Sequence, residues 1–185
     1  KVVAIGECGL DYYWPSHDGW KTGEGVEKKR QKELFEQQIK LAVVLKLPLM
    51  IHGRPTKKSM DAYEDILSII KKYKEIHGEV VRGNIHFFAG TLAIAEQFWA
   101  LGFTTSFTGV VTFSRDYDEV IKAAPLAMLM AETDSPYATP APHRGTPNTP
   151  LFASLIYQKI ADLKDISLEV IQRQFEENRK RIFSI

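Results

Sequence analysis

Cysteine and net charge are both scarce in this sequence of 185 residues. Cys8 is its one cysteine, which excludes a disulfide within the chain and a zinc cluster built from cysteines, and suits a reducing compartment. The 24 Lys and Arg residues nearly balance the 23 Asp and Glu residues, so no overall positive field gathers a polyanion onto the surface. We therefore expect a cytoplasmic protein that holds any nucleic acid through local contacts.

Long apolar runs are missing as well. No stretch reaches the roughly 18–20 apolar residues needed to cross a bilayer, and no basic segment followed by an apolar one opens the chain as a signal peptide does, so we expect no membrane association. The chain starts at Lys1, directly before an apolar run and without an initiator methionine. We expect it to be the later part of a longer protein, with residues 1–185 forming a single domain truncated at its N-terminus.

Short apolar runs alternate with longer amphipathic stretches, which is typical of βα units around a buried parallel sheet. A closed (β/α)₈ barrel has eight strands and needs roughly 250 residues, so the fold class is α/β, a TIM-type (β/α) barrel with about five of eight βα units present. An open doubly wound sheet is the alternative, but no glycine-rich phosphate-binding loop follows any strand. The five expected strands are residues 2–6, 47–51, 84–88, 104–110 and 127–131.

Helices are expected between these strands and after the last one. The first covers residues 25–46, with Phe35, Gln38, Ala42 and Leu45 on its buried stripe, and the charges on its other face are interleaved as in a solvated helix. The next two cover residues 59–73 and 92–101. Thr149 before Pro150 predicts the start of a helix that runs to about residue 163, and Ser167 predicts the cap of the last helix. The proline-rich stretch 136–150 predicts a rigid surface loop. The second helix is expected to bury Tyr63, Ile66, Ile70 and Tyr73, and the last one Ile171, Phe175, Asn178 and Ile182.

Side chains that can bind a metal follow four of the five expected strands. They are Glu7, His52, His86 and, after Glu132, Asp134. Because the carboxyl ends of parallel strands meet at one edge of the sheet, we expect these groups to lie close together. Imidazole and carboxylate together suit Zn²⁺ or Mn²⁺, whereas an all-oxygen set would suit Mg²⁺ or Ca²⁺. Either histidine alone is more simply a hydrogen-bonded core residue, but the coincidence of four groups predicts a divalent-metal site.

Four segments closely resemble the motifs of the TatD family of metal-dependent deoxyribonucleases, in the same order and at similar spacing. They are Gly-Glu-Cys-Gly-Leu-Asp-Tyr-Tyr at 6–13, Ile-His-Gly-Arg at 51–54, His-Phe-Phe-Ala-Gly at 86–90 and Glu-Thr-Asp-Ser-Pro-Tyr at 132–137. Arg144 and Gly145, with Asn148 and Pro150, resemble a further family segment, and residues 178–183 resemble the family's C-terminal ending. The resemblance therefore covers the whole chain, and its first and fourth motifs together are specific.

The resemblance implies a barrel that holds one or two divalent ions, of Zn, Mn or Mg, and hydrolyses phosphodiester bonds in DNA, in single strands or at ends. Matched position by position, Glu7 would bridge two metals, and His52 and His86 would each be ligands. Asp134 would be a ligand that also orients or deprotonates the attacking water. Such a site is physically coherent, since paired ions can lower the pKa of a bound water and clamp the phosphate oxygens during an in-line displacement.

Other positions receive supporting roles from the same resemblance. Arg54 and Arg144 would grip the substrate phosphate, which suits the planar fork of a guanidinium. Glu132 and Asp11 would support the metal ligands through hydrogen bonds, although Asp11 could equally cap its own turn. Pro55 stands where the family usually has a polar or acidic residue after the arginine, so the family pattern does not predict the backbone conformation after His52.

The family's first strand carries a His-x-His pair, and no such pair occurs here. If residues 1–185 were the whole polypeptide, the barrel could not close and two sheet edges would stay open. We would then expect weak metal binding and little nuclease activity until an upstream segment was restored. Two further hypotheses stay open: a metallohydrolase of the amidohydrolase kind acting on a substrate other than nucleic acid, and a non-catalytic remnant of the fold.

Several residues near these motifs have simpler explanations. Cys8 alternates with Glu7 along the strand and is expected in the core, as a small apolar residue rather than a nucleophile. Four aromatic residues after the first motif could stack on splayed bases, although packing within the loop explains them more simply. They are Tyr12, Tyr13, Trp14 and Trp20. Three histidines, His17, His77 and His143, end no expected strand and are assigned no role.

Overall fold

The computed structural model describes residues 2–13 and 23–185, so Trp14, His17 and Trp20 lie outside the described residues. Five strands form one parallel sheet in the order β1-β2-β3-β4-β5. Each strand therefore lies beside the one that precedes it along the chain, which confirms the predicted succession of βα units. The strands are β1 (Ile5–Asp11), β2 (Leu49–Arg54), β3 (Gly83–His86), β4 (Thr104–Phe107) and β5 (Leu129–Ala131).

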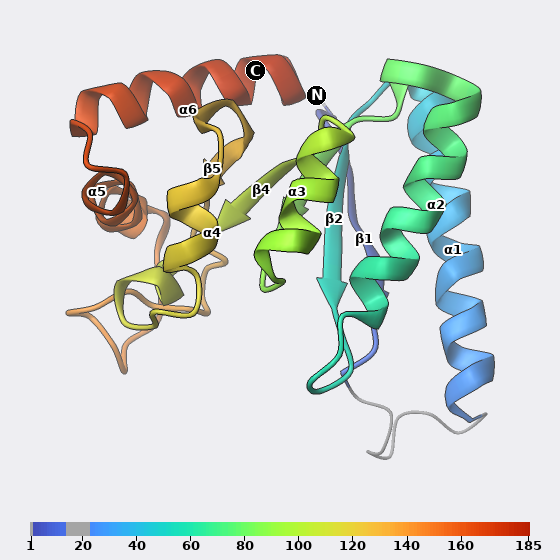
Figure 1. The fold of residues 1–185 in the computed structure, drawn as a ribbon, viewed down its shortest axis with the longest axis horizontal. Coiled ribbons are helices and arrows are strands. Elements are labelled where there is room, and N and C mark those ends of the chain that lie inside the picture. The colour runs from blue at the N-terminus through green and yellow to red at the C-terminus, as the bar shows by residue number, and fades with distance from the viewer. Residues whose placement is uncertain (1, 14–22) are drawn as a thin grey trace.

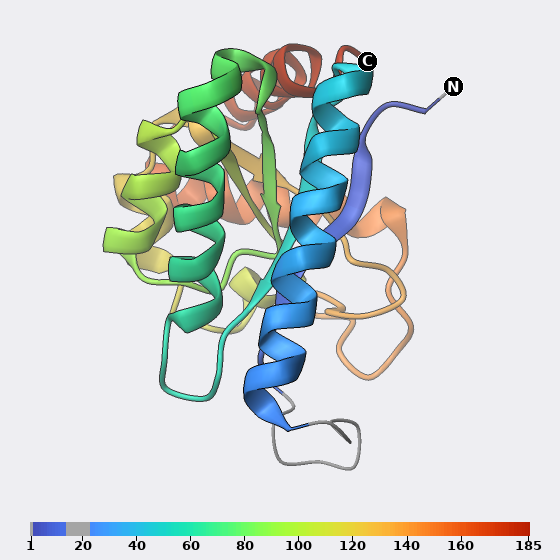
Figure 2. The ribbon, with the colours of Figure 1, turned by 90° about the vertical axis from the view of Figure 1, so that its right-hand side faces the viewer.

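Helices α1 to α4 cover one face of this sheet, and α6 runs across the end at which the strands begin, near both termini (Figures 1 and 2). The opposite end, toward which the arrow of β2 points in Figure 1, carries the loops that follow the strands. No helix within residues 2–13 and 23–185 is long and apolar enough to cross a membrane. The helices are α1 (Glu24–Leu45), α2 (Asp61–His77), α3 (Leu92–Ala100), α4 (Asp118–Ala123), α5 (Ala153–Lys164) and α6 (Leu168–Phe183), and short 3₁₀ turns cover Gly78–Val80, Gly109–Thr112, Leu126–Met128 and Pro150–Phe152.

The first strand lies later in the chain than predicted. The apolar run 2–6 was expected to form it, yet β1 comprises Ile5–Asp11 and Val2 is 67% exposed. Pairing decides the strand here, because β1 follows β2 until its last residue lies beside Arg54. As a result, Glu7 lies inside the strand and not at its end.

The buried stripe of α1 also differs from the predicted one. Phe35 and Ala42 are buried as expected, but Ile39 is the third buried residue, and Leu45 is 51% exposed. Positions 35, 39 and 42 follow the i, i+4, i+7 spacing of one helix face. Leu45 lies ten residues after Phe35, which rotates it by roughly 80° from that face at about 100° per residue. Gln38 is only partly buried.

Two boundaries and one short helix later in the chain differ from the prediction. β4 ends at Phe107 and continues as a 3₁₀ turn instead of a longer strand. Thr149 makes no side-chain cap, and the helix after it begins with a 3₁₀ turn at Pro150–Phe152. The short helix α4 was not predicted, since six residues carry too little periodicity to recognise. The stretch 136–149 contains neither helix nor strand, as expected.

The last helix follows its sequence pattern closely. Ser167 accepts a hydrogen bond from the backbone N–H of Val170, which confirms the predicted cap of α6. Asn178 is 1% exposed and donates from Nδ2 to the carbonyl oxygens of Leu126 and Leu129, at 2.8 and 2.7 Å. This buried amide fastens α6 to the start of β5, and so helps to fix the strand that leads into Glu132. The predicted inward residues of α2 and α6 are all buried: Tyr63, Ile66, Ile70, Tyr73, Ile171, Phe175, Asn178 and Ile182.

Candidate metal centre

Three side chains from neighbouring strands converge at the loop end of the sheet. Glu7 of β1, His52 of β2 and His86 of β3 each offer a ligand atom, and these atoms lie within 4.8 Å of one another. Oε1 of Glu7 lies 2.8 Å from Nδ1 of His52 and 3.7 Å from Nε2 of His86. The two imidazoles therefore present one nitrogen each to the same carboxylate oxygen.

Strand register produces this convergence. Gly9, His52 and His86 are direct partners across β1, β2 and β3. Gly9 has a φ of +140°, and a Cβ atom built on it would lie 2.0 Å from the carbonyl oxygen of His52. Only glycine allows β1 to approach β2 this closely, so it brings Glu7 within reach of His52.

Glu132 orients the ring of His86 from the side opposite Glu7. It follows β5 directly and accepts hydrogen bonds from Nδ1 of His86 and, at 2.7 Å, from the backbone N–H of Phe87. With Nδ1 engaged, Nε2 of His86 faces Glu7 and Oδ1 of Asp134, each at 3.7 Å. A carboxylate that holds the far nitrogen of a histidine fixes its tautomer, as it commonly does beside metals in proteins.

Asp11 contacts His52 in the same way, on the side of the ring opposite Glu7. Its Oδ2 lies 3.2 Å from Nε2 of His52, and its Oδ1 accepts a hydrogen bond from the backbone N–H of Tyr13 at 3.0 Å. The two roles that the sequence left open, a ligand support and a turn cap, are thus both present in the contacts. Gln31 of α1 holds the main chain of Asp11 at both its N–H and its carbonyl group, at 2.8 and 2.9 Å.

Asp134 lies beside the three clustered groups on the loop after β5. Its backbone is left-handed, with a φ of 56°, and its carbonyl oxygen accepts from the N–H of Tyr137 at 2.8 Å. Asn148 is 6% exposed and donates to the carbonyl oxygens of Thr133 and Tyr137 at 2.7 and 2.6 Å. The buried amide of Asn148 therefore holds the strained turn that aims Asp134 at His86.

The charges of the cluster shift its ionisation. Burial alone would lower the pKa of the His52 imidazole, but the hydrogen bond to Asp11 and the charge of Glu7 outweigh it and raise that pKa. The pKa of His86 is raised in the same way, by Glu132 above all. Burial raises the pKa of Asp134, and the charges of Glu132 and Glu7 add to the rise against the opposing effect of His86. The electrostatic potential of the centre is thus negative and attracts cations, whether protons or metal ions.

The three clustered donors fit a divalent metal. Two ligands bound at about 2.0–2.2 Å in a tetrahedral arrangement lie roughly 3.4 Å apart, and the two distances from Oε1 of Glu7 bracket that value at 2.8 and 3.7 Å. Two imidazole nitrogens with a carboxylate oxygen are a donor set for Zn²⁺ or Mn²⁺ rather than for Ca²⁺.

An open cleft of about 750 Å³ lies over the centre. Arg54 lines it, with its guanidinium carbon 3.9 Å from the ring centre of Tyr13. Arg144 does not line it; its guanidinium lies over the ring of Phe113 at 4.0 Å, and Nη1 donates to the carbonyl oxygen of Thr139. The residues around the cleft are Glu7, His52, Gly53, Arg54, Pro55, His86, Phe87, Ala89, Asp134 and Tyr137.

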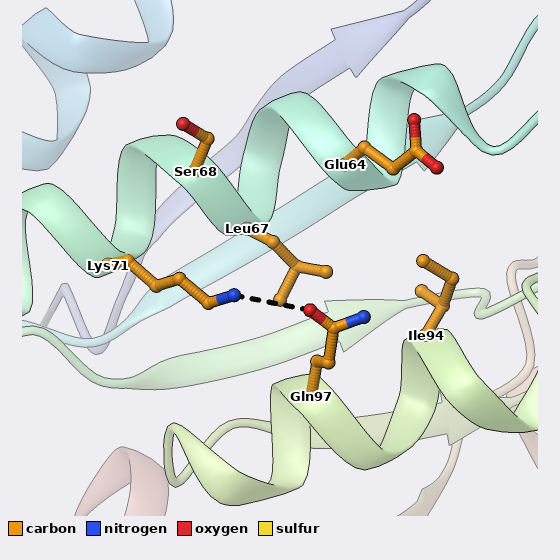
Figure 3. Close-up of a pocket in the computed structure, with 6 residues that line it drawn as sticks. All are labelled: Glu64, Leu67, Ser68, Lys71, Ile94 and Gln97. Atoms are coloured by element: carbon orange, nitrogen blue, oxygen red, sulfur yellow. Dashed lines mark hydrogen bonds between the residues drawn. The ribbon is translucent and has the colours of Figure 1, made fainter.

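A second hollow, of about 260 Å³, lies between α2 and α3 (Figure 3). The close-up shows Lys71 of α2 reaching across to Gln97 of α3, a hydrogen bond of 3.2 Å. Leu67 and Ile94 form the apolar part of its lining. It is a groove between two helices on the outer face and lacks the histidines of the cleft.

Two residues near the first motif pack as the simpler explanation predicted. Tyr12 is 0% exposed and donates its hydroxyl to Asp65 at 2.9 Å, so it is not available to stack on a base. Cys8 is buried at 6% exposure and its thiol points to the carbonyl oxygens of Ile5 and Met50. Of the aromatic residues described here, Tyr13 and Tyr137 are the exposed ones beside the centre, and Tyr137 was not singled out from the sequence.

Three buried polar residues behind the centre were also missed in the sequence. Asn84, Thr104 and Ser106 lie on β3 and β4, and Ser106 donates to Oε1 of Glu132 at 2.5 Å. Their signal was the polar composition of strands expected to be buried on both faces, where branched apolar residues are usual.

Comparison with known proteins gives concordant matches. The model of the family described as "TatD related DNase" matches residues 1–184. "Uncharacterized metal-dependent hydrolase YabD" of Bacillus subtilis is 40% identical over 187 residues, and "Uncharacterized metal-dependent hydrolase YcfH" of Escherichia coli K12 is 35% identical; the chain is covered fully and spans 66% and 63% of these relatives. The crystal structure of YJJV, a TatD homolog from Escherichia coli K12, superposes with a TM-score of 0.82 at 27% identity, over 100% of this chain and 64% of that one. The chain thus spans about two thirds of the length of the proteins it matches.

Proposed function

Because the chain belongs to the TatD-related DNase family, we propose that it is the metal-binding part of a hydrolase that cleaves phosphodiester bonds in DNA with one or two divalent ions. The observation that carries this proposal is the convergence of Glu7, His52 and His86 within 4.8 Å, beneath an open cleft. The donor set favours Zn²⁺ or Mn²⁺. Single strands or DNA ends are the proposed substrates, as the family resemblance implies, and because the charge of the chain is nearly balanced they would be held by local contacts in the cleft.

Glu7, His52 and His86 are the proposed ligands, and Asp134 the proposed fourth one. When bound, a divalent cation would supply Lewis acidity, lowering the pKa of a water molecule and drawing charge from the phosphate. Glu132 and Asp11 hold the far nitrogens of the two histidines, at Nδ1 of His86 and Nε2 of His52. They keep the rings in one orientation without substrate present, so little reorganisation is needed at the moment of reaction.

Asp134 is the proposed general base. It lines the cleft, and its pKa is raised by burial and by the neighbouring carboxylates. A carboxylate that faces the cleft can accept a proton from a water molecule held there. Its oxygen lies 3.7 Å from Nε2 of His86, which places the proton acceptor beside the atoms that hold the metal.

Arg54 is the proposed phosphate contact. It is exposed at the end of β2, lines the cleft and stacks on Tyr13. A stacked guanidinium keeps its edge donors in a fixed plane and can make two parallel hydrogen bonds to a phosphate. Arg144 remains a proposed contact only for a substrate that extends to Phe113, because it lies outside the lining of the cleft.

The test is a substrate panel with the purified protein and Zn²⁺ or Mn²⁺. Single-stranded DNA, duplex DNA, RNA and p-nitrophenyl esters are offered in parallel, and Glu7→Gln serves as the matched inactive control. Turnover of DNA that requires metal and is lost in Glu7→Gln supports the proposal. Turnover of esters alone would favour the metallohydrolase of another substrate class, and metal binding without any turnover would favour the non-catalytic remnant.

A further inference from the structure

A chain of buried polar side chains runs through the middle of the sheet. Asn84 on β3 is 2% exposed, and Thr104, Thr105 and Ser106 on β4 are 0%, 0% and 2% exposed. Central parallel strands are usually lined by branched apolar residues on both faces, and a buried polar group is costly unless it is hydrogen-bonded. Hydroxyl and amide groups at these positions therefore call for a structural or functional reason.

The hydrogen bonds that link these polar side chains all run in one direction. Thr104 donates its hydroxyl to Oδ1 of Asn84 at 2.9 Å, and Nδ2 of Asn84 donates to Oγ of Ser106 at 2.7 Å. Ser106 then donates to Oε1 of Glu132 at 2.5 Å. Since the hydroxyl oxygen of Ser106 accepts a hydrogen bond from Asn84, its own O–H is directed to the carboxylate of Glu132.

The two oxygens of Glu132 are divided between different donors. Oε1 accepts from Ser106 and from the backbone N–H of Phe87, while Oε2 faces Nδ1 of His86. With Oε1 held from two sides, the carboxylate plane has one orientation, and Oε2 is committed to the histidine. The backbone of Phe87 is left-handed, with a φ of 44°, so the same carboxylate also holds a strained turn.

We propose that Ser106 is a positioning residue of the metal centre, which, oriented by Asn84, sets the Glu132 carboxylate so that His86 presents Nε2 to the metal. The proposal rests on the proposed metal binding at Glu7, His52 and His86, and adds a residue that is separated from the metal by Glu132 and His86. Ser106 touches neither metal nor substrate; it acts through Glu132.

Thr105 provides a matched control on the same strand. It too is a buried hydroxyl residue, but it lies on the opposite face of β4, where it accepts a hydrogen bond from Nε1 of Trp99 at 3.2 Å. Thr105→Val and Ser106→Ala each remove one buried hydroxyl. Thr105→Val loses a hydrogen bond between β4 and α3, whereas only Ser106→Ala removes a hydrogen bond to Glu132.

The first experiment measures Zn²⁺ affinity by calorimetric titration of the purified protein. Ser106→Ala is expected to weaken binding about 10-fold, the lower end of what loss of an indirect support costs, while Thr105→Val stays within about two-fold of the wild type. In a Glu132→Gln background, Ser106→Ala is expected to add no further loss, because its path to His86 is already broken. Equal losses in Ser106→Ala and Thr105→Val, or an undiminished loss in the Glu132→Gln background, would overturn the proposal.

The second experiment requires no metal and keeps the proposal testable if a variant folds poorly. The nitrogen NMR shifts of His86, recorded without metal at a pH where the ring is neutral, should show the proton on Nδ1 in the wild type and in Thr105→Val, and partly on Nε2 in Ser106→Ala. The wild-type tautomer in a folded Ser106→Ala variant would count against the proposal. A wild-type ring protonated on Nε2 would overturn the proposal outright. Failure of the wild type to bind Zn²⁺ would count against the proposed function alone, since the tautomer of His86 would still decide the role of Ser106.

Discussion

Asp11 and His52 form a pair on the side of the metal centre away from Glu7. Oδ2 of Asp11 lies 3.2 Å from Nε2 of His52, while Nδ1 of the same ring lies 2.8 Å from Glu7. Glu132 and His86 form a second pair of this kind. Each proposed histidine ligand is therefore backed by its own carboxylate, contributed by a different strand or strand end.

Asp11→Asn separates the two contacts of Asp11. The amide oxygen can still accept from the N–H of Tyr13, so the turn survives, whereas the amide nitrogen is a poor partner for Nε2 of His52 when that atom carries the proton. Loss of such a support typically lowers metal affinity by about 10–100-fold. We expect this loss in a Zn²⁺ titration, with a melting temperature of the metal-free protein near that of the wild type. Affinity equal to the wild type would leave Asp11 as a turn cap only.

Asp134→Asn should remove turnover and retain substrate binding. The amide has the shape of the carboxylate but cannot take a proton from water, and loss of a general base typically costs about 10²–10⁴-fold in rate. We expect kcat to fall within that range in a DNA hydrolysis assay at saturating Zn²⁺, which compensates for the lost ligand, with KM changing little. Glu119→Gln, an exposed carboxylate on α4, is the control and should keep full activity. Wild-type kcat in Asp134→Asn would assign the base to another group.

Arg54→Lys should raise KM for DNA more than it lowers kcat. Lysine keeps the charge but loses the planar fork and its stacking on Tyr13. Arg144→Lys is the matched control, because Arg144 stacks on Phe113 outside the cleft lining. We expect a short oligonucleotide to distinguish the two variants, with KM raised several-fold in Arg54→Lys alone. Equal effects of both changes would extend the substrate path to Arg144.

Metal affinity should fall as the pH is lowered, starting above the ordinary histidine pKa of 6.5. Both His52 and His86 have raised pKa values, so protons compete with the metal at higher pH than they would at unperturbed rings. The stability of the metal-free protein should change with pH in the opposite direction. There the raised pKa values stabilise the fold below about pH 6.5, and this contribution is lost as the pH rises through the folded-state values.

Zn²⁺ titrations and thermal unfolding between pH 5.5 and 9 would check both statements. The affinity should rise with pH, while the histidine contribution to the stability of the metal-free protein should decline over the same interval. A metal affinity independent of pH across this range would exclude the histidines as ligands.

Cys8 should be almost inert in the folded protein. Burial, assisted by the charge of Glu7, raises the pKa of its thiol to about 12. Because the thiolate is the reactive form, labelling by Ellman's reagent at pH 8 should be at least about 1,000-fold slower than in guanidinium chloride. The chain has one cysteine, so the absorbance change reports this site alone. Rapid labelling in native buffer would show that β1 opens readily.

The pattern of the sequence was sufficient for the order of the strands and of the longer helices. Apolar runs separated by amphipathic stretches predicted five parallel strands, and the stripe of Tyr63, Ile66, Ile70 and Tyr73 on α2 is buried as predicted. Such periodicity depends on which face of an element meets the core, a property each segment carries locally. The rule that the carboxyl ends of parallel strands meet at one edge of a sheet predicted that Glu7, His52 and His86 lie together, as they do.

Contacts between elements were decided by the tertiary structure alone. Pairing with β2 moved β1 past its apolar run to Asp11 and created the pair with His52. The direction of the hydrogen bonds from Asn84 through Ser106 to Glu132 depends on the relative register of β3, β4 and β5. Periodicity along one strand reports the face of a residue but not which residue of the next strand lies opposite. That register exists only once the strands have paired, which is why the sequence could indicate the clustered residues and the carboxylates of Glu132 and Asp11, but not the polar side chains that hold Glu132.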